Sequence, residues 1–451
     1  MRKIAISQRL LENTSYHEIR EALDINYSKL ISECGFLPII LPYEVDFEKY
    51  FTFLDIDGVL LTGGNDLGIC DMNELSLKRD AYEKKLIEFC IQNEIPVYGI
   101  CRGMQIIADF FKSSFKTIKD QVNVRHRLKI NTNSRYENQL KKIDVVNSFH
   151  NFTIDKLPPE FIVSAYNEKG VIKAIEHKTN SIFGQMWHSE RENPFSQPEL
   201  NLIQDFFNEN ISNVIEIAKL ASRSIMEIYN QNDFKVKYKD DKSPVTKADL
   251  NANKIIIDQL NKISKYPVIT EENPIEYKIR KNWKKFWLVD PLDGTKDFIS
   301  KNGQFTVNIA LISNNQPVMG VVYLPNSGDV YFAIKNGGAF KNGVQIFNNS
   351  KRVELIGFDS KFHSTEKTKD FFKNQNIKKV KKYGSSIKLC KLAEGTIDIY
   401  PRFNGTKEWD TAASQIIIKE AGCKIIDLKT KKELIYNKVT MNNNHFIACR
   451  N

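Results

Sequence analysis

Hydrophobic and polar positions in the first half of the chain alternate between short apolar runs and longer segments with helical spacing. The expected strands cover residues 3–7, 36–41, 57–61, 96–100, 143–146, 161–166, 171–176 and 181–186, and the expected helices cover 17–34, 76–93, 102–111 and 197–209. Apolar strands that alternate with helices are typical of a parallel sheet covered on both faces. The polar, irregular segment 125–140 is expected to be an exposed excursion.

The second half begins with helical patterns and then becomes rich in strands. Helices are expected over 211–229 and 248–263, and strands over 268–269, 286–289, 305–312, 318–324 and 330–334. This change of pattern indicates a second, layered α+β domain. No spacer rich in Gly, Pro or Ser separates the two halves. We therefore predict domains at 1–208 and 210–451.

Composition and length are those of an ordinary globular protein. The 451 residues are 41% hydrophobic and 27% charged, and at about 100–200 residues per domain they suggest two to four domains. No apolar run approaches the ~20 residues needed to cross a bilayer, and the opening residues do not resemble a signal peptide. The seven cysteines include no CxxC pair, which favours reduced thiols. We expect a cytoplasmic protein without a membrane partner.

Charge divides the chain at the same point. The net charge is −5 up to Glu209 and +15 from Asn210 onward, for a total of +10. The basic half has no recognisable nucleic-acid-binding module, so we expect no nucleic-acid partner. Its lysines either form a solvated surface or attract a small polyanionic substrate.

Cys101 is the first candidate for chemistry. It lies between the expected strand 96–100 and the expected helix 102–111, with Gly99 and Gly103 beside it. A sharp strand-to-helix turn projects such a side chain outward, and the helix N-terminus favours a thiolate and can hold an oxyanion. The alternative is a buried cysteine that packs at the strand end.

A base and its carboxylate follow another expected strand, at His188 and Glu190. A cysteine nucleophile needs a base, and that base needs an acceptor that fixes its tautomer. With these residues the chain resembles the class I glutamine amidotransferases across roughly 1–208, in particular their γ-glutamyl hydrolase branch. The resemblance rests on Thr62-Gly63-Gly64-Asn65-Asp66, Arg79-Asp80, Gly99-Ile100-Cys101-Arg102-Gly103-Met104-Gln105, Val145-Val146-Asn147-Ser148-Phe149-His150 and the His188/Glu190 pair.

This resemblance implies a three-layer sandwich with a parallel sheet and a set of site residues. Cys101 would be the nucleophile, His188 the general base and acid, Glu190 the orienting carboxylate, Gly64 and Arg102 the backbone donors to the oxyanion, and Asn147, Ser148 and His150 substrate-binding residues. His150 is equally compatible with a pocket-lining or structural role. The chain departs from the family at 111–114, where Phe-Lys-Ser-Ser replaces paired glycines. Residues 5–10 and 146–152 look most like the γ-glutamyl-CDP-amidate hydrolases of capsular phosphoramidate biosynthesis.

Acidic residues follow separate strands of the second half. Asp290 and Asp293 lie on a turn that Pro291 stiffens, Glu271 ends another strand, and Asp410 lies at a helix start. Neighbouring carboxylates repel one another unless cations lie between them, and oxygen-only ligands select Mg²⁺ over Zn²⁺. Helix capping is the alternative for any one of them, Asp410 above all.

The second half resembles the inositol monophosphatase superfamily across roughly 211–451, nearest to its 3′(2′),5′-bisphosphate nucleotidases. Supporting motifs are Ser243-Pro244-Val245-Thr246-Lys247-Ala248-Asp249, Asp290-Pro291-Leu292-Asp293-Gly294-Thr295, Gly303 to Asn308, Gly384-Ser385-Ser386-Ile387-Lys388, Pro401-Arg402-Phe403 and Glu408 to Ala413. The resemblance implies a layered α+β sandwich in which Glu271, Asp290, Asp293 and the Leu292 carbonyl hold Mg²⁺, Asp410 completes a second metal site, Asp249 and Thr295 orient the attacking water, and Leu292 to Thr295 hold the phosphate. Glu272 is either a ligand or a neighbour of one, and Lys388 and Arg402 are either nucleotide contacts or solvent-facing salt bridges.

The leading hypothesis is a bifunctional enzyme with two small-molecule substrates. Hydrolysis of γ-glutamyl-CDP-amidate would release glutamate and cytidine diphosphoramidate, and a phosphatase would return CMP from cytidine 3′,5′-bisphosphate. One alternative is a glutaminase fused to an adenosine 3′,5′-bisphosphate phosphatase, and another is a catalytically silent nucleotide-binding regulator. The sequence leaves a homo-oligomer open.

Overall fold

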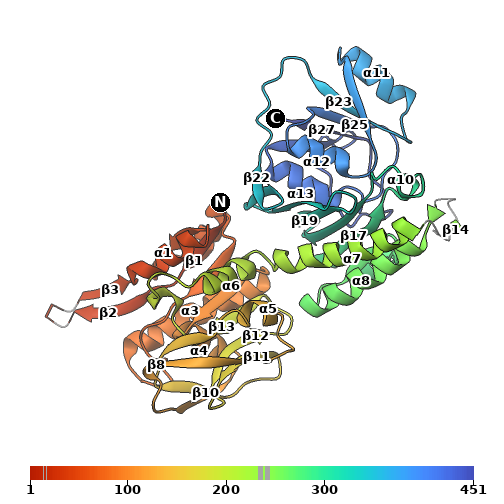
Figure 1. Cartoon of the computed structure of the whole chain (residues 1–451). Helices are drawn as coiled ribbons and strands as arrows, with labels where there is room; N and C mark the ends of the chain where they lie inside the picture. Colours follow the sequence, from red (N-terminus) through yellow and green to blue (C-terminus); the bar gives the residue numbers. More distant parts are fainter. Residues whose placement is uncertain (14, 17, 232–236, 239–243) are drawn as a thin grey trace. The chain divides into compact units, whose positions relative to one another are not determined.

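A computed structural model describes residues 1–451 apart from 14, 17, 232–236 and 239–243. The chain divides into two compact units, Met1–Asn210 and Ile211–Asn451 (Figure 1). Among the helices in the described part of the chain, none is long and apolar enough to cross a membrane.

The first unit is built on a sheet with the strand order β4-β1-β5-β6-β13-β12-β11-β8-β9. The strands are β1 (Lys3–Ile6), β4 (Leu37–Ile40), β5 (Gly58–Leu61), β6 (Val97–Ile100), β8 (Val122–Ile130), β9 (Val145–Phe149), β11 (Phe161–Asn167), β12 (Ile172–His177) and β13 (Ile182–Gln185). From β4 to β13 neighbouring strands are parallel, as the sequence predicts. From β13 to β9 they are antiparallel, and the connections from β11 to β12 and from β12 to β13 are too short for crossover helices.

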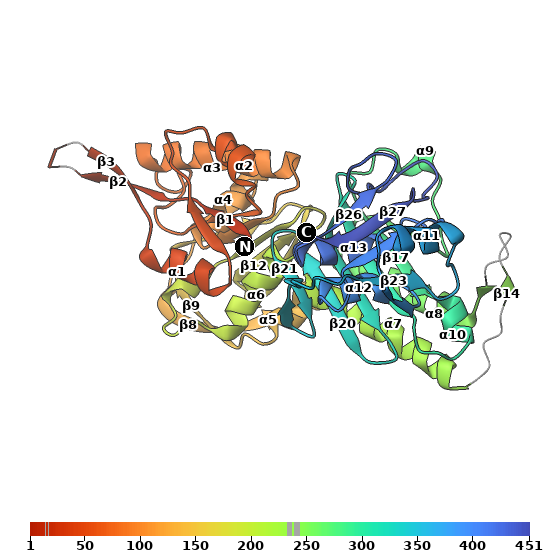
Figure 2. The same cartoon turned by 90° about the horizontal axis from the view of Figure 1, so that it is seen from above.

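Helices cover both faces of this sheet. They are α1 (Ile25–Glu33), α2 (Phe47–Leu54), α3 (Glu74–Gln92), α4 (Arg102–Phe110), α5 (Glu137–Leu140) and α6 (Gln197–Phe207). The connections from β1 to β4 and from β5 to β6 run in opposite directions across the sheet, so right-handed crossovers place α1 and α3 on opposite faces. Figure 2 shows α1 and α6 on one face and α3 and α4 on the other. The three-layer sandwich is confirmed.

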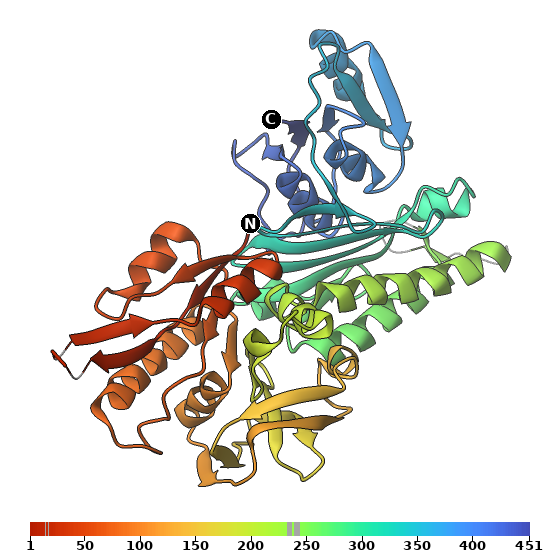
Figure 3. The ribbon, with the colours of Figure 1, turned by 60° about the vertical axis from the view of Figure 1, so that its left-hand side comes forward.

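Two expectations for this unit are wrong. Only the second part of the expected helix 17–34 is helical; Glu18–Ala22 is strand β3, paired in a hairpin with β2 (Arg9–Asn13) (Figure 3), and residue 17 lies outside the described residues. Asp24 caps α1, so helical periodicity starts only after it. The expected excursion 125–140 contains most of β8 and α5. Because its side chains are mostly polar, this segment has no hydrophobic pattern typical of a strand. Its backbone nevertheless pairs with β9 and β11.

The second unit is layered. Helices α7 (Ile211–Gln231) and α8 (Lys247–Ile263) cover one face of a sheet with the order β16-β17-β18-β19-β20-β21-β22, and α13 (Ala412–Glu420) packs on the other face (Figures 1 and 3). The strands are β16 (Val268–Thr270), β17 (Lys285–Asp293), β18 (Thr306–Ser313), β19 (Gln316–Leu324), β20 (Asp329–Ile334), β21 (Gly338–Lys341) and β22 (Val344–Ile346). The expected helices and strands of this part are confirmed.

A further sheet, the helices beside it and a few short elements complete the unit. The second sheet has the order β24-β23-β25-β27-β26 and contacts α12, α13 and α11. Its strands are β23 (Ile356–Ser360), β24 (Lys379–Tyr383), β25 (Ile399–Arg402), β26 (Cys423–Asp427) and β27 (Phe446–Arg450); the helices are α11 (Glu366–Asn374) and α12 (Ile387–Ala393). The remaining short elements are α9 (Tyr277–Arg280), α10 (Thr295–Ile299) and the pair β14 (Lys237–Tyr238) and β15 (Pro244–Val245).

The backbones of α13 and of the β16–β22 sheet approach each other closely, and this approach fixes how the helix packs on the sheet. A Cβ at Gly320 of β19 would lie 2.2 Å from the Ala413 carbonyl oxygen of α13. Gly320→Ala should therefore lower the free energy of unfolding by about 1–3 kcal/mol, since backbone rather than a flexible side chain would have to move. Chemical denaturation followed by circular dichroism measures this change. Gly405→Ala is the control, because its Cβ would meet nothing within 4 Å; an equal loss in both variants would contradict the packing argument.

Candidate active sites

Cys101 occupies a strained turn between β6 and α4. Its φ of 53° lies in the left-handed region, which residues with side chains rarely adopt unless packing enforces it. A Cβ at Gly103 would lie 2.1 Å from the Leu61 carbonyl oxygen, so the helix start presses directly on β5. The Cys101 backbone N–H donates to the Gln185 carbonyl, at 2.7 Å. This is the nucleophile-elbow geometry that the sequence predicts.

His188 and Glu190 meet this thiol. His188 Nδ1 lies 2.5 Å from Glu190 Oε1, and both side chains are buried. Nε2 of the imidazole is buried without a hydrogen-bond partner and so remains available to the Cys101 side chain, whose charge acts on the ring. Burial lowers the pKa of His188, but the Cys101 thiolate and the Glu190 carboxylate outweigh it and raise that pKa to about 10. The arrangement favours the charged imidazolium form of His188.

Two further residues hold the histidine and its carboxylate. The Asn147 side chain accepts the His188 N–H and donates to the His188 carbonyl, both at 2.8 Å. The Tyr27 hydroxyl accepts the Gly63 N–H at 2.9 Å and interacts with Glu190. Asn147 thus positions the histidine, while its predicted substrate contact stays a prediction. Sequence reasoning missed Tyr27, since one aromatic residue in an amphipathic helix carries no motif.

A buried ion-pair network supports the predicted oxyanion donors. The Arg102 side chain pairs with Asp80 and Glu83, while its backbone N–H lies at the start of α4. Arg79 also pairs with Glu83, at 3.0 Å, and donates to the Gly63 carbonyl at 3.0 Å. Burial would raise the pKa of Glu83, but Arg102 and Arg79 lower it. The network ties the loop that ends in Gly64 to the helix that follows the nucleophile; Glu83 was missed.

Ser148 and His150 lie buried beside a lysine that sequence reasoning also missed. Lys173 Nζ is 2.9 Å from Ser148 Oγ and 3.0 Å from His150 Nε2. Burial and the Lys173 charge lower the pKa of His150 to about 3, so its ring is neutral at pH 7. Contact of Ser148 and His150 with a substrate stays a prediction.

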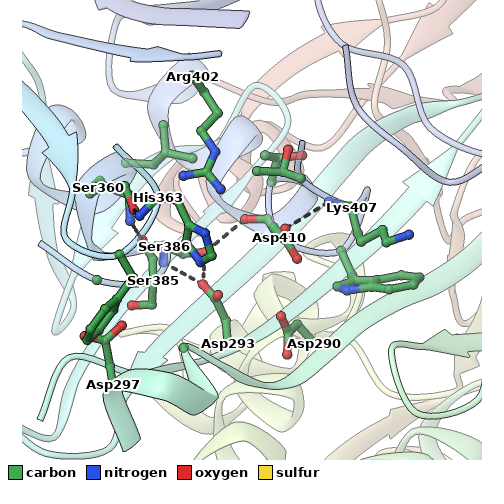
Figure 4. Close-up of a pocket in the computed structure, with 18 of the residues that line it drawn as sticks. Asp290, Asp293, Asp297, Ser360, His363, Ser385, Ser386, Arg402, Lys407 and Asp410 are labelled. Carbon is green, nitrogen blue, oxygen red and sulfur yellow. Dashed lines mark hydrogen bonds between the residues drawn. The ribbon is translucent and has the colours of Figure 1, made fainter. Parts of the chain in front are cut away.

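The second unit has a cavity of about 490 Å³ at its acidic motifs (Figure 4). The predicted residues that line it are Glu271, Asp290, Leu292, Asp293, Gly294, Thr295, Lys388, Arg402 and Asp410. Lys388 and Arg402 are buried, so the solvent-facing alternative is wrong for both. Lys388 Nζ donates to the Ser385 carbonyl at 2.6 Å, and Arg402 Nε donates to the Asn404 carbonyl at 3.1 Å.

Strand β17 itself carries the first acidic pair. The expected turn at 290–293 is instead a continuation of β17, with a shift of register against β18 between Asp290 and Asp293. Such a bulge re-aims side chains and tolerates Pro291, which has no N–H to pair. Asp290 Oδ1 accepts the Leu292 N–H at 3.1 Å, which orients the carboxylate.

Mutual repulsion marks these carboxylates. Burial, together with Glu271, Asp293 and Asp410, raises the pKa of Asp290 well above its usual range. Burial, Asp293 and Glu271 raise the pKa of Asp410 to about 8. Among the residues that the structure describes, no three His, Cys, Asp or Glu side chains come together as the ligands of a single metal ion would. An oxygen-only donor set that repels itself nevertheless fits a hard divalent cation.

Ser386 orients Asp293 from across the cavity. Its N–H and hydroxyl donate to Asp293 Oδ2 at 2.6 and 2.8 Å (Figure 4). His363 also lines the cavity, and burial lowers its pKa to about 4. Neither was singled out as a site residue, although Ser386 belongs to the Gly384 to Lys388 motif. Asp410 does not cap α13, whose N-cap residue is Thr411.

Asp249 and Thr295 form a dyad at the edge of this cavity. Thr295 Oγ1 donates to Asp249 Oδ1 at 3.2 Å. Asp249 Oδ2 accepts from Thr246, which caps α8, and burial raises the pKa of Asp249 to about 6. Glu272 acts on Asp249 through its charge. Ser243 of the supporting motif lies outside the described residues.

Comparison with known families assigns a family to each half of the chain. The Inositol monophosphatase family model matches residues 208–450, and the Peptidase C26 model matches residues 4–190. The chain belongs to the inositol monophosphatase family, joined to a Peptidase C26 member. It is therefore a hydrolase that fuses two enzyme families.

Individual relatives match one half each. The 3′(2′),5′-bisphosphate nucleotidase CysQ of Escherichia coli (strain K12) is 40% identical over 227 residues, 49% of this chain and 92% of the relative. Gamma-glutamyl-CDP-amidate hydrolase of Campylobacter jejuni is 39% identical over 208 residues, 46% of this chain and 97% of the relative. The crystal structure of CysQ from Bacteroides thetaiotaomicron, 37% identical, has a TM-score of 0.50 and covers 54% of this chain and 98% of its own.

The raised pKa of Asp410 has a consequence for stability. A carboxyl group whose pKa is higher in the folded than in the unfolded protein stabilises the fold at low pH. This stabilisation is lost as the pH rises from about 4, the pKa in the unfolded chain, to about 8, the pKa in the folded protein. Asparagine at position 410 carries no charge at any of these pH values, so Asp410→Asn does not lose this stability as the pH rises. In EDTA the free energy of unfolding of the variant should exceed that of the wild type by at least about 1 kcal/mol at pH 8, and this difference should be smaller at pH 5.

Urea unfolding at the two pH values measures this difference. Asp258→Asn, at an exposed position of α8, is the control and should show no such dependence. A wild type whose stability is independent of pH between 5 and 8 would contradict the repulsion.

Proposed function

We propose that the first half hydrolyses a γ-glutamyl amide, with γ-glutamyl-CDP-amidate as its substrate and glutamate and cytidine diphosphoramidate as products. The observation that carries this proposal is the meeting of Cys101, His188 and Glu190 at the strand–helix elbow. The similarity to the Campylobacter jejuni hydrolase supports the choice of substrate.

The chemistry follows from the positions of these side chains. The Cys101 thiolate forms a bond to the γ-carbonyl carbon, the C–N bond breaks, and His188 gives its proton to the leaving nitrogen. Water then gives a proton to His188 and attacks the thioester, which releases glutamate and restores the thiolate. Glu190 holds the imidazole by Nδ1 throughout. The backbone N–H groups of Gly64 and Arg102 would receive the developing oxyanion.

We propose that the second half removes the 3′-phosphate from a nucleoside 3′,5′-bisphosphate, with cytidine 3′,5′-bisphosphate giving CMP. Glu271, Asp290, Asp293, the Leu292 carbonyl and Asp410 would hold Mg²⁺, which supplies Lewis-acid activation of water and of the leaving oxygen when bound. The Thr295–Asp249 dyad would orient that water and accept its proton. Lys388 and Arg402 give the same cavity positive charge for an anionic substrate.

The two activities are joined by the cytidine that both substrates share. Transfer of the phosphoramidate group from a 3′-phosphorylated form of the first product leaves cytidine 3′,5′-bisphosphate, the substrate of the second half. The kinase and the transferase that this sequence of reactions needs would be separate proteins. Both proposed partners of this chain are small molecules.

Cys101→Ala tests the first activity. Removal of the nucleophile should lower glutamate release from γ-glutamyl-CDP-amidate by at least about a thousandfold, with phosphate release from the bisphosphate unchanged. Glutamate is measured with a coupled dehydrogenase. The matched control is Cys90→Ala, which removes another buried thiol. Glutamate release that survives in Cys101→Ala would refute the assignment.

Asp290→Asn tests the second activity. Phosphate release should require Mg²⁺, should be inhibited by Ca²⁺ and Li⁺, and should fall by about a thousandfold in the variant, while γ-glutamyl hydrolysis is unchanged. The assay compares cytidine and adenosine 3′,5′-bisphosphates with inositol phosphate, and Asp258→Asn is the control variant. Faster turnover of inositol phosphate would rule out a nucleotidase, and a strong adenosine preference would break the link between the two activities.

A further inference from the structure

Lys173 lies at the same edge of the first sheet as the nucleophile. The Lys173 carbonyl, on β12, accepts the Met186 N–H at 2.8 Å, and the preceding Gln185 carbonyl accepts the Cys101 N–H at 2.7 Å. In the order β6-β13-β12, the lysine is therefore two strands from the nucleophile. Its side chain is completely buried, with 0% exposed. The lysine is close enough to the thiol site for the charge of Cys101 to act on its pKa.

All three N–H donors of this lysine are used by neutral groups. Nζ donates to Gln121 Oε1 at 2.9 Å, to Ser148 Oγ at 2.9 Å and to His150 Nε2 at 3.0 Å. The His150 ring is neutral because burial and the Lys173 charge lower its pKa to about 3; its Nδ1–H donates to the Phe152 carbonyl at 3.0 Å, which leaves Nε2 to accept from Lys173. Over the residues that the structure describes, no carboxylate lies within ion-pair distance of Lys173 Nζ.

A buried ammonium without an anion is expensive. The effective penalty for burying an ion in a protein is several kcal/mol when no opposite charge compensates it. Arg79 and Arg102, the other buried cations of this site, are paired with Glu83 and Asp80. Burial lowers the pKa of Lys173 only to about 8, with the charges of Cys101 and Glu168 opposing the shift. The side chain keeps most of its charge at pH 7, and since none of its three hydrogen-bond partners is an anion, an anionic group of a ligand would compensate that charge further.

The contacts of Lys173 also decide what Ser148 can do. The Ser148 oxygen accepts from Nζ, so its own O–H points away from the lysine and is free to donate. Attack of Cys101 on a γ-glutamyl carbonyl leaves the α-carboxylate of the substrate three carbons away. A hydroxyl polarised by a neighbouring ammonium is a strong donor to such an anion.

We propose that Lys173 is a positioning residue that directs the Ser148 hydroxyl, and adds its own charge, toward an anionic group of the γ-glutamyl substrate. That group is either the α-carboxylate of the glutamyl part or a phosphate of the leaving group. The inference rests on the proposed γ-glutamyl hydrolysis. It assigns to this chain a specificity-determining cation beneath Ser148 and His150.

Lys173→Met tests the inference with three substrates. They are γ-glutamyl-p-nitroanilide, which has the carboxylate but no phosphate, 4-aminobutanoyl-p-nitroanilide, which lacks both, and γ-glutamyl-CDP-amidate. The variant should raise KM for substrates with the recognised anion by about tenfold or more, with kcat within about threefold, since it removes a charge-assisted interaction. Its kcat/KM for 4-aminobutanoyl-p-nitroanilide should be unchanged.

The pattern across the substrates identifies the anion. A rise in KM for both γ-glutamyl substrates assigns the α-carboxylate, and a rise for γ-glutamyl-CDP-amidate alone assigns the phosphate. An equal loss with all three substrates would mean that Lys173 only supports the fold, and no loss with any would mean that its charge is not used. Either result overturns the inference and leaves the proposed function standing. A wild type that releases no glutamate from any substrate overturns both.

Two further variants complete the experiment. Lys178→Met removes an exposed positive charge one residue beyond β12 and should leave all three reactions unchanged. Ser148→Ala keeps the lysine but removes the hydroxyl, and it should reproduce the selective rise in KM. If Lys173→Met does not fold in a thermal melt, Ser148→Ala decides: a non-selective effect there overturns the inference.

Discussion

The cost of burying charge is the constraint on which the structure of both units depends. In the first unit, Glu83 lies completely buried between Arg79 and Arg102, and each arginine also ties down the chain that forms the site. Arg79 holds the loop after β5, and Arg102 begins the helix after Cys101. Because each charge has its partner, the network can be rigid without a ligand. The elbow, which stores backbone strain, is built on this rigid base.

The second unit meets the same constraint in the opposite way. Asp290, Asp293 and Asp410 face one cavity, and burial together with their mutual repulsion raises the pKa values of Asp290 and Asp410. The neighbouring polar groups orient individual carboxylates, as Ser386 does for Asp293, but do not neutralise the set. A site of this kind is incomplete in the protein alone and is suited to cations and a phosphate. In the first unit, Lys173 is likewise a buried charge whose hydrogen-bond partners do not neutralise it, but here the charge is positive.

The two halves of the chain therefore carry sites in which the buried charges are balanced in different ways. In the thiol site His188 lies between Cys101 and Glu190, whose charges raise its pKa, and the supporting contacts from Asn147 and Tyr27 are already made. In the acidic cavity the carboxylates instead raise one another's pKa values, and burial adds to this effect. Each arrangement places its reactive groups at the ends of strands, where side chains from several elements can meet.

The sequence by itself determined those helices, strands and site residues that can be recognised within a short segment of the chain. The spacing of apolar residues predicted β6, α4, α7 and α8, and short motifs predicted Cys101, His188, Glu190 and the acidic residues that line the cavity. The hairpin β2–β3, the antiparallel half of the first sheet and the continuation of β17 through Pro291 depend on pairing with distant strands, which no short segment records. Tyr27, Glu83, Lys173 and Ser386 acquire their roles only from neighbours far away in the chain, such as Glu190 for Tyr27 or Ser148 for Lys173. Periodicity reports which face of an element is buried, whereas the partner of a buried polar group is decided only when the elements pack together.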